Sequence, residues 1–298
     1  MKGCAILSLF TGCATALITP FKDGKIDYVS MGKIIEWQIK EHIDALVVCG
    51  TTGEASTLSN KEKYQLVKFV VDLVDGRVPV IAGSGTNNTS LSLELSKEME
   101  DMGVDGLLMV TPYYNRCTEK GLIAHYEKVA DNVSLPIIMY SVPSRTGVNI
   151  SPSAVSILSK HPNIVGIKEA SGNISQICEI ASYISEDFNV YSGNDDQTIP
   201  IMSLGGIGCI STVSNIIPAR YTKMIHDYLD GKNIEAGAEQ VILKPLIDSI
   251  FTEVNPGPIK AAMNMLGMCN MEYRLPMCVP SNKTQFIIYD ALEEFGLI

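Results

Sequence analysis

The run NIVGIK, at residues 163–168, decides the fold class. It is a short apolar run rich in β-branched residues, and it ends in a charged residue, Lys168. An apolar run without polar alternation is typical of a parallel strand whose two faces are both buried. Similar runs recur along the chain at intervals of roughly 30 residues, which shorten toward the end. They are CATALI (13–18), ALVVC (45–49), VPVIA (78–82), GLLMV (106–110), PIIMY (136–140), NVY (189–191) and IGCIS (207–211).

Helical periodicity fills the intervals between these runs. Apolar residues recur every three or four positions in 30–42, 59–74 and 89–103. The second segment begins with Ser59 followed by Glu62, the spacing of a capping box. Eight strand and helix units are the number that closes a parallel barrel. The sequence therefore predicts an α/β fold, a (β/α)8 TIM barrel.

The strand pattern stops after Ser211, and the rest of the chain has a helical pattern interrupted by Pro and Gly. We expect a (β/α)8 catalytic barrel over residues 1–227 and a small C-terminal helical domain over residues 228–298. No low-complexity linker separates the two parts, which favours rigid packing between them. The predicted helices of this last part of the chain span 217–229, 232–251, 256–267 and 282–295.

The charge balance excludes two classes of partner. The chain has 23 Lys and Arg against 33 Asp and Glu, a net charge of −10. This charge repels nucleic-acid phosphates and anionic lipid surfaces, and no basic segment offsets it. The longest apolar runs are also far shorter than the roughly 20 residues that span a bilayer. We expect a soluble protein that binds neither nucleic acid nor membrane.

Cysteine and histidine spacing argues against a metal centre. The eight cysteines contain no C-x-x-C pair, and the four histidines are scattered. Most cysteines lie in apolar runs and are interpreted as buried, reduced thiols, which favours a cytoplasmic location. The apolar stretch from Cys4 to Phe10 is short for the core of a secretion signal, so export is not favoured. We expect no metal and no cofactor.

Lys168 is the most informative residue because active sites of such barrels lie at the carboxyl ends of the strands. Desolvation at the end of an apolar strand lowers the pKa of a lysine and frees a neutral amine. Such an amine can attack a carbonyl carbon and form a Schiff base without metal or cofactor. A structural ion pair with the adjacent Glu169 or another carboxylate is the alternative, and the spacing alone leaves both open.

Polar residues after other strands complete a candidate site. Tyr140 ends the neighbouring strand, where its phenol can transfer protons beside the amine, although packing is an equally simple role. Thr51 and Thr52 lie between Gly50 and Gly53 in a turn that resembles a backbone anion cradle. Arg145, in the loop after Tyr140, suits a substrate carboxylate.

Nucleotide binding has weak support. Gly83, Ser84 and Gly85 follow the third strand in the manner of a dinucleotide fingerprint. Asn88 stands where the third glycine of that fingerprint is needed, and no P-loop pattern occurs in the chain.

Together these motifs resemble one family, the pyruvate-dependent class I aldolases of the N-acetylneuraminate lyase superfamily, and within it the dihydrodipicolinate synthases. The resemblance covers residues 11–298, with the motifs in family order and at family spacing. They are GTTGE (50–54), AGSG (82–85), TPYYNR (111–116), Y-x-VPSRTG (140–147), GIKEASG (166–172), SGND (192–195), NP-x-P-x-K (255–260) and RLP (274–276).

The resemblance implies a lyase that condenses pyruvate with aspartate 4-semialdehyde at the start of the diaminopimelate and lysine pathway. It implies that Lys168 forms the imine with pyruvate. It also implies that Tyr114 acts across a subunit interface, in a homotetramer built as a dimer of dimers. The other implied site residues are Tyr140 and Thr52 in a proton relay with Tyr114, Thr51 and Thr52 at the pyruvate carboxylate, Arg145 at the semialdehyde carboxylate, and Gly193 and Ile210 along the pocket.

Two departures from the family pattern stand out. Ser141 occupies a position where the family usually has Asn, next to the implied catalytic tyrosine. The positions that bind the feedback inhibitor lysine in sensitive members correspond to Leu91, Asn60 and Lys63. A carboxylate for the inhibitor's amino group is missing there and a positive charge is added, which predicts weak or absent inhibition by lysine.

Two other functions are compatible with parts of the pattern. Lyases for N-acetylneuraminate or 2-keto-3-deoxy sugar acids share the lysine and the tyrosine. The second hydroxyl of GTTGE and Arg145 favour the synthase, because an arginine suits a short carboxylate-bearing aldehyde better than a polyol. A non-catalytic barrel that senses a keto acid is the third reading, and the complete set of site residues argues against it.

Overall fold

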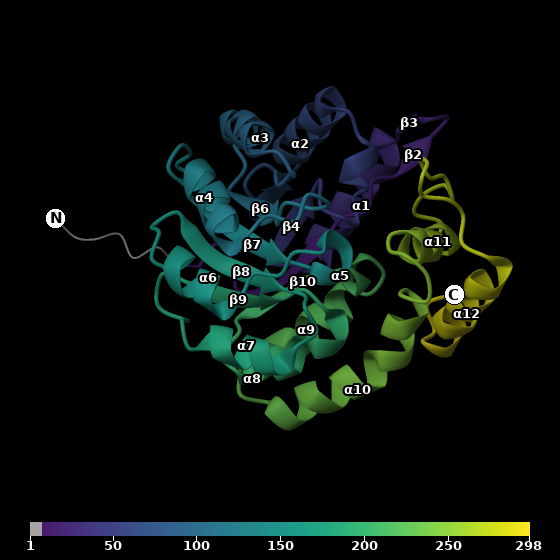
Figure 1. Ribbon diagram of the computed structural model, residues 1–298. Helices are drawn as coiled ribbons and strands as arrows, with labels where there is room; N and C mark the ends of the chain where they lie inside the picture. The colour runs from purple at the N-terminus through teal and green to yellow at the C-terminus, as the bar shows by residue number, and fades with distance from the viewer. Residues whose placement is uncertain (1–7) are drawn as a thin grey trace.

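The centre of the molecule is a closed barrel of eight parallel strands, seen in a computed structural model that describes residues 8–298 (Figure 1). Successive barrel strands are neighbours, and the last pairs with the first through Gly12 and Gly208. The predicted TIM barrel is confirmed. Its strands are β1 (Gly12–Ala16), β4 (Ala45–Val48), β5 (Val80–Gly83), β6 (Gly106–Val110), β7 (Ile137–Ser141), β8 (Ile164–Glu169), β9 (Asn189–Ser192) and β10 (Gly208–Ser211).

Two apolar clusters explain why the strands have continuously apolar sequences. In β4, Ala45 and Val47 belong to the cluster inside the barrel, whereas Leu46 and Val48 belong to the cluster between barrel and helices. Side chains alternate between the two faces of a strand, and here both faces are covered. An alternating polar pattern is therefore absent from the strands.

Phe10 packs at the amino end of the barrel. Its ring stacks on that of Tyr191 with centroids 4.5 Å apart, and the Tyr191 hydroxyl donates to the Phe10 carbonyl at 2.8 Å. The segment before β1 is thus built into the barrel from Phe10 onward. Most of the apolar stretch that begins at Cys4 lies outside the described residues.

Helices surround the barrel on its outer side (Figure 1). Most of them begin at a polar residue whose side chain accepts from the first backbone N–H groups, as at Asp27, Asn88 and Thr118. Ser59 and Glu62 form the predicted capping box. The helices are α1 (Tyr28–Lys40), α2 (Asn60–Val74), α3 (Thr89–Asp101), α4 (Glu119–Ala130), α5 (Pro143–Thr146), α6 (Pro152–Leu158), α7 (Ile174–Ala181), α8 (Thr198–Ser203), α9 (Pro218–Leu229), α10 (Asn233–Ser249), α11 (Gly257–Met265) and α12 (Asn282–Glu294), with short 3₁₀ turns η1 (Ala55–Thr57), η2 (Asp195–Gln197) and η3 (Val213–Asn215).

A small antiparallel ribbon follows the first barrel strand and was not predicted. Its strands are β2 (Phe21–Lys22) and β3 (Lys25–Ile26). Asp23 and Gly24 form the turn between them with φ values of 53° and 75°. An Asp-Gly pair with two left-handed residues is a typical hairpin turn, so the sequence did contain the signal.

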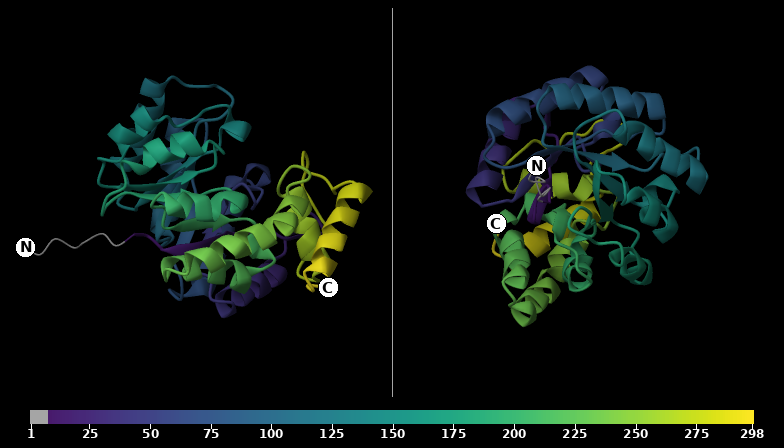
Figure 2. Two further views of the ribbon diagram at one scale, coloured as in Figure 1. Left: turned by 90° about the horizontal axis from the view of Figure 1, so that it is seen from below. Right: turned by 90° about the vertical axis from the view of Figure 1, so that its left-hand side faces the viewer.

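The C-terminal helices lie together on one flank of the molecule (Figure 2). Helix α10 packs against α8, α9 and α12, and α12 packs in turn against α11. The segment from 250 to 260 brings α11 to the carboxyl end of the barrel, where Asn255 contacts the loop after β4. The domain boundary between residues 227 and 228 falls in the last turn of α9 and stays a prediction.

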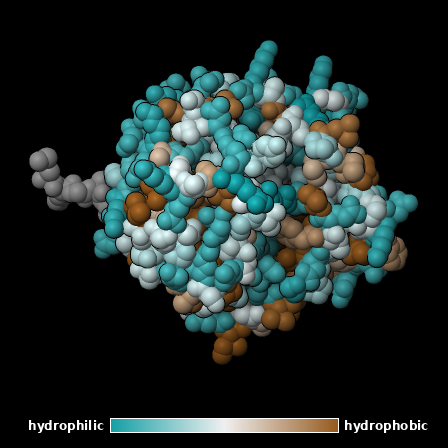
Figure 3. Space-filling model, viewed as in Figure 1, coloured by the Kyte–Doolittle hydropathy of each residue, from teal (hydrophilic) through white to brown (hydrophobic). Residues whose placement is uncertain are grey.

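The surface shown in Figure 3 is largely hydrophilic, with several separate apolar patches, one of them at the lower edge. That edge is formed by α10, where Ile234, Val241 and Ile242 are exposed. Within residues 8–298, no helix has the length and apolar composition needed to cross a membrane.

Candidate active site

A cavity of about 180 Å³ opens at the carboxyl ends of the barrel strands. The loops after β4, β7 and β9, the end of β8 and the segment before α11 supply its walls. Six of the predicted site residues line it: Thr51, Thr52, Tyr140, Arg145, Lys168 and Gly193. The rule that barrel enzymes gather reactive groups at this face therefore holds for this chain.

Lys168 lies beside Tyr140 because of the strand register. The two residues are Cα partners in the ladder between β7 and β8, and both side chains point into the cavity. The Lys168 Nζ atom lies 4.4 Å from the centroid of the Tyr140 ring. Lys168 is 5% exposed and makes no ion pair within the described part of the chain. The alternative pairing with Glu169 is wrong, because the Glu169 carboxylate instead accepts from the Ser171 backbone N–H at 2.8 Å.

Gly193 gives the lysine stem its room. A Cβ atom at Gly193 would lie 3.1 Å from the Lys168 Cε atom and 2.7 Å from the Ala170 Cβ atom. Only glycine fits this approach without moving its neighbours. Ile210, the other residue expected along the pocket, is 1% exposed and packs in the apolar cluster inside the barrel.

The GTTGE turn after β4 is tightly hydrogen bonded. The Glu54 N–H donates to the Thr51 carbonyl at 3.1 Å, and the Thr19 hydroxyl donates to the Gly53 carbonyl at 2.6 Å. Glu54 has a φ of 52°, a left-handed conformation that reverses the chain. These contacts hold the Thr51 and Thr52 hydroxyls at the cavity wall.

Asn255 joins two of the predicted residues and was missed by the sequence interpretation. Its side-chain amide donates to the Thr52 hydroxyl at 3.0 Å, and its backbone carbonyl accepts from the Arg145 guanidinium at 3.2 Å. It is 5% exposed and lines the cavity. The motif NP-x-P-x-K contains it, but a residue some 200 positions from Thr52 carries no local sign of this contact.

Arg145 stands at the mouth of the cavity. It lies in α5, a single turn that begins with Pro143 directly after β7. The turn places the guanidinium on the side of the opening and leaves it exposed. A cation in this position can pair with a ligand anion through two parallel hydrogen bonds.

Tyr114 does not reach the cavity of its own chain. Its side chain is 90% exposed, and its backbone has a φ of 73°. Its N–H donates to the Thr146 carbonyl at 3.4 Å, which holds the loop against α5. Of the predicted site residues, Tyr114 and Ile210 are the two that this chain does not bring to the cavity.

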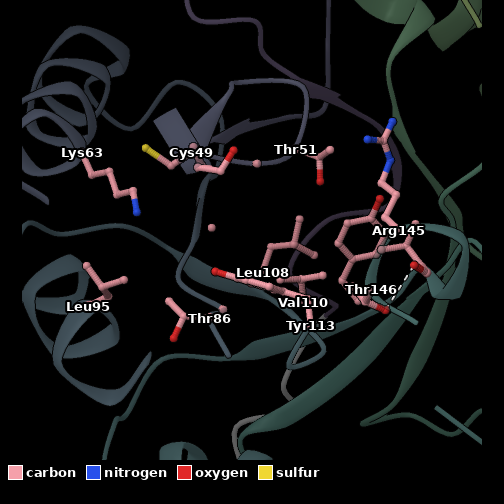
Figure 4. A pocket seen from close by; sticks show the side chains of 17 residues that line it. Cys49, Thr51, Lys63, Thr86, Leu95, Leu108, Val110, Tyr113, Arg145 and Thr146 are labelled. Carbon is pink, nitrogen blue, oxygen red and sulfur yellow. Dashed lines mark hydrogen bonds between the residues drawn. The ribbon is translucent and has the colours of Figure 1, made fainter. Parts of the chain in front are cut away.

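A second cavity, of about 320 Å³, adjoins the first and shares Thr51, Tyr140 and Arg145 with it (Figure 4). Lys63 and Tyr113 point into it from opposite sides. Burial lowers the pKa of Lys63 from its usual value. Asn60 and Leu91 correspond, like Lys63, to positions that bind the inhibitor lysine in sensitive family members, but neither lines this cavity.

Asp195 anchors the loop at the end of β10. Its carboxylate accepts from the backbone N–H groups of Thr212 and Val213 at 3.1 Å and 2.9 Å. Burial raises the pKa of Asp195, while these hydrogen bonds and the charge of Lys168 oppose the rise. The carboxylate therefore holds Thr212 near Thr52, with the two hydroxyl oxygens 3.4 Å apart.

The cysteines are free thiols in the described part of the chain. Burial raises the pKa of Cys49 and of Cys209 to about 12, which makes both weak nucleophiles and poor metal ligands. Between residues 8 and 298, no group of three His, Cys, Asp or Glu side chains is arranged to hold a metal ion.

Comparisons with known proteins find relatives that match this chain over nearly its full length. The model of the Dihydrodipicolinate synthetase family matches residues 9–294. A 4-hydroxy-tetrahydrodipicolinate synthase from Thermoanaerobacter sp. (strain X514) is 47% identical over 293 residues, covering 98% of this chain and 99% of the relative. The 4-hydroxy-tetrahydrodipicolinate synthase 1 from Clostridium acetobutylicum is 48% identical over 292 residues, covering 98% of this chain and 100% of the relative. The crystal structure of dihydrodipicolinate synthase from Thermotoga maritima superposes with a TM-score of 0.96 at 41% identity, covering 97% and 100%.

Proposed function

The chain belongs to the dihydrodipicolinate synthetase family, and from that premise we propose how its residues carry out the reaction. It is a lyase of the Schiff-base aldolase type that condenses pyruvate with L-aspartate 4-semialdehyde to 4-hydroxy-tetrahydrodipicolinate, in the biosynthesis of diaminopimelate and lysine. One observation carries the assignment of roles: a buried lysine, which forms no ion pair with any residue from 8 to 298, lies against a tyrosine inside a cavity that has an arginine at its mouth.

Lys168 forms the covalent intermediate. Its amine attacks the C2 carbonyl of pyruvate, and loss of water leaves an imine in place of the carbonyl. The imine nitrogen then accepts the electron pair released when the pyruvate methyl loses a proton, giving an enamine. The enamine carbon attacks the aldehyde carbon, and the amino group of the second substrate finally displaces Lys168 from C2, which closes the ring.

Tyr140 moves protons during these steps. Its ring lies against the lysine amine, so we assign its hydroxyl as the acid and base that serves the carbon that becomes the imine. Thr52 extends the path toward the opening of the cavity. Because the Thr52 hydroxyl accepts from Asn255, its own hydrogen is free to point to another acceptor.

The two substrate carboxylates have separate partners. The backbone and hydroxyls of Thr51 and Thr52, in the rigid turn after β4, hold the carboxylate of pyruvate. Arg145, at the mouth, holds the carboxylate of the aldehyde that enters second. Gly193 keeps the wall beside the lysine free of side-chain atoms.

Tyr114 completes the relay from a second copy of the chain. Its exposed ring lies outside its own cavity, on a loop next to the second cavity. That cavity borders on Thr51 and Tyr140, the wall that an incoming phenol must reach to enter the relay. We propose a dimer in which each subunit's Tyr114 reaches the other's site, and a homotetramer formed by two such dimers.

Trapping with borohydride tests the covalent step. Reduction in the presence of pyruvate is expected to fix one pyruvate per chain, seen by intact mass, and Lys168→Ala is expected to lose the adduct. Lys244→Met is the control, because Lys244 is an exposed residue of α10 paired with Asp248. The absence of an adduct from the wild-type protein would rule out the mechanism.

Substrate assays test the choice within the superfamily. The chain is expected to consume pyruvate and aspartate 4-semialdehyde and to cleave neither N-acetylneuraminate nor 2-keto-3-deoxygluconate at an appreciable rate. Lysine is expected to inhibit weakly or not at all, and a micromolar inhibition constant would contradict this. Free thiols throughout the described residues support a reducing compartment, and we propose a cytoplasmic location.

A further inference from the structure

A fully buried ion pair joins the C-terminal segment to the GTTGE turn. The Lys260 Nζ atom lies 2.6 Å from the Glu54 Oε1 atom, and both side chains are 0% exposed. The lysine also lies over the ring of Phe21, with 4.0 Å to its centroid. No step of the proposed reaction uses either charge.

Glu54 places a negative charge in the turn that receives a carboxylate. Its N–H is hydrogen bonded to the Thr51 carbonyl, and its side chain does not line the cavity but accepts from Lys260. Like charges repel strongly where water is excluded. An unpaired Glu54 would therefore weaken the binding of an anionic ligand by Thr51 and Thr52.

Lys260 removes this penalty. We propose that Lys260 is a positioning residue that neutralises Glu54 and so allows the GTTGE turn to bind the carboxylate of pyruvate. The inference rests on the proposed function, which puts that carboxylate at the turn. Lys260 is not itself a second nucleophile, because its amine is sealed from the cavity and donates to Glu54.

Neighbouring contacts show that the C-terminal segment holds the whole turn. The Arg274 N–H donates to the second oxygen of Glu54 at 3.4 Å, and the Asn255 amide donates to Thr52 at 3.0 Å. The ion pair thus stands between two hydrogen bonds from the same part of the chain. Helix α11 and the segments on either side of it therefore neutralise the charge of the GTTGE turn and also hold the turn in position.

The test measures the Michaelis constant for pyruvate in variants that remove one or both charges. Loss of structure would impair every variant, whereas the inference expects KM to rise when Lys260 is replaced and not to rise when Glu54 is replaced. Lys260→Met is expected to raise KM for pyruvate about tenfold and to change kcat less. Lys260→Met combined with Glu54→Gln removes both charges and is expected to restore KM to within about threefold of wild type. Glu54→Gln alone leaves a cation near the turn, so its KM is expected to be equal or lower. Lys244→Met, in the exposed pair of α10, is the matched control and is expected to leave KM unchanged.

Pyruvate titration of the borohydride adduct separates this inference from the proposed function. The Lys260→Met protein is expected to reach full labelling at Lys168, but at higher pyruvate concentrations than wild type. The inference would be overturned by a wild-type KM in Lys260→Met, or by a KM in the double variant as high as in Lys260→Met. In either case, formation of the adduct at Lys168 would still support the Schiff-base mechanism. Should Lys260→Met fail to fold, a raised KM in Glu54→Gln would overturn it equally.

Discussion

At the scale of single residues, the site depends on the register between β7 and β8. Because Tyr140 and Lys168 are ladder partners, the phenol ring covers the amine without help from any loop. Side chains placed by strands keep their geometry better than side chains placed by loops. The strand register therefore fixes the position of the Lys168 amine, which the proposed mechanism needs for attack on a carbonyl.

Tyr140→Phe separates the two roles of this tyrosine. The substitution keeps the ring against Lys168 but removes the hydroxyl, so a loss of proton transfer without a loss of packing is expected. We expect kcat to fall by about 10² to 10⁴ while the thermal midpoint changes little. Steady-state kinetics and thermal unfolding measure the two quantities, and a wild-type kcat would exclude Tyr140 from the relay.

Glu169 predicts a pH dependence of stability. Its Oε2 atom is buried without a hydrogen-bond partner among the described residues, and burial raises its pKa above the usual 4.5. A carboxyl whose pKa is raised by folding adds no cost below the unfolded-state pKa of 4.5. The destabilisation of the native state grows as the pH rises from 4.5 to the folded-state pKa, and it is complete above that pKa. Glu169→Gln removes this cost and is expected to raise the free energy of unfolding by about 1 kcal/mol at pH 8. Denaturant unfolding at pH 8 and pH 4 measures it, and the gain is expected to vanish at pH 4.

The sequence predicted those site residues whose chemistry is unusual for their position. Lys168 ends an apolar strand and Arg145 lies in the loop after the preceding strand; neither position needs a cation for core packing, so both residues indicated a site. Asn255 and Lys260 gave no such sign, since an asparagine before proline and a lysine in a helix are ordinary residues. Their contacts to Thr52 and Glu54 depend on tertiary packing across more than 200 residues.

At the scale of elements, the periodic pattern predicted all eight strands to within about two residues at each end. The buried strands were distinct because polar helices and turns separate them. The ribbon of β2 and β3 was missed because two-residue strands show no period, although their Asp-Gly turn is a local signal. The helix predicted over 217–229 matches α9 (Pro218–Leu229), whereas the domain boundary at residue 227, which was inferred from the end of the strand pattern, stays a prediction.

The start of α2 carries a charge that ties it to the C-terminal segment. Glu62 accepts two hydrogen bonds from the Arg274 guanidinium, at 2.6 Å and 3.0 Å. Together with its hydrogen bonds to Ser59 and against the cost of burial, this arginine lowers the pKa of Glu62 to about 2. A lowered pKa adds stability that is complete above the unfolded-state pKa of 4.5 and is lost as the pH falls through 2.

Glu62→Gln tests this contribution while keeping the helix cap, because glutamine also closes a capping box. The variant is expected to lose about 1 kcal/mol of unfolding free energy at pH 7 and to approach wild type near pH 2. Chemical denaturation across this pH range measures the difference. Glu36→Gln is the control, since Glu36 pairs with Arg77 on the open surface and a smaller effect is expected. Equal losses in the two variants would contradict a special role for the α2 start.

At the scale of the whole molecule, one chain does not bring all four residues of the proposed relay together. Lys168, Tyr140 and Thr52 line one cavity, whereas Tyr114 lies on the surface beside the second cavity. The proposed dimer would bring the exposed Tyr114 ring of one chain to the second cavity of the other. Isologous interfaces form closed dimers, and in the proposed dimer each site would need both subunits.

Mixing two inactive variants tests this exchange. Lys168→Ala and Tyr114→Phe are each expected to lose most activity on their own. In a mixed dimer, the Tyr114→Phe subunit keeps Lys168 and receives an intact Tyr114 from the other subunit, so one of its two sites is complete. Random reassortment of equal amounts should therefore restore about a quarter of wild-type activity per chain. Lys168→Ala mixed with Tyr140→Phe is the control, because both changes affect groups that one chain supplies to one cavity, and no mixed site is complete. Equal recovery in the two mixtures, or none in the first, would show that Tyr114 does not act across an interface.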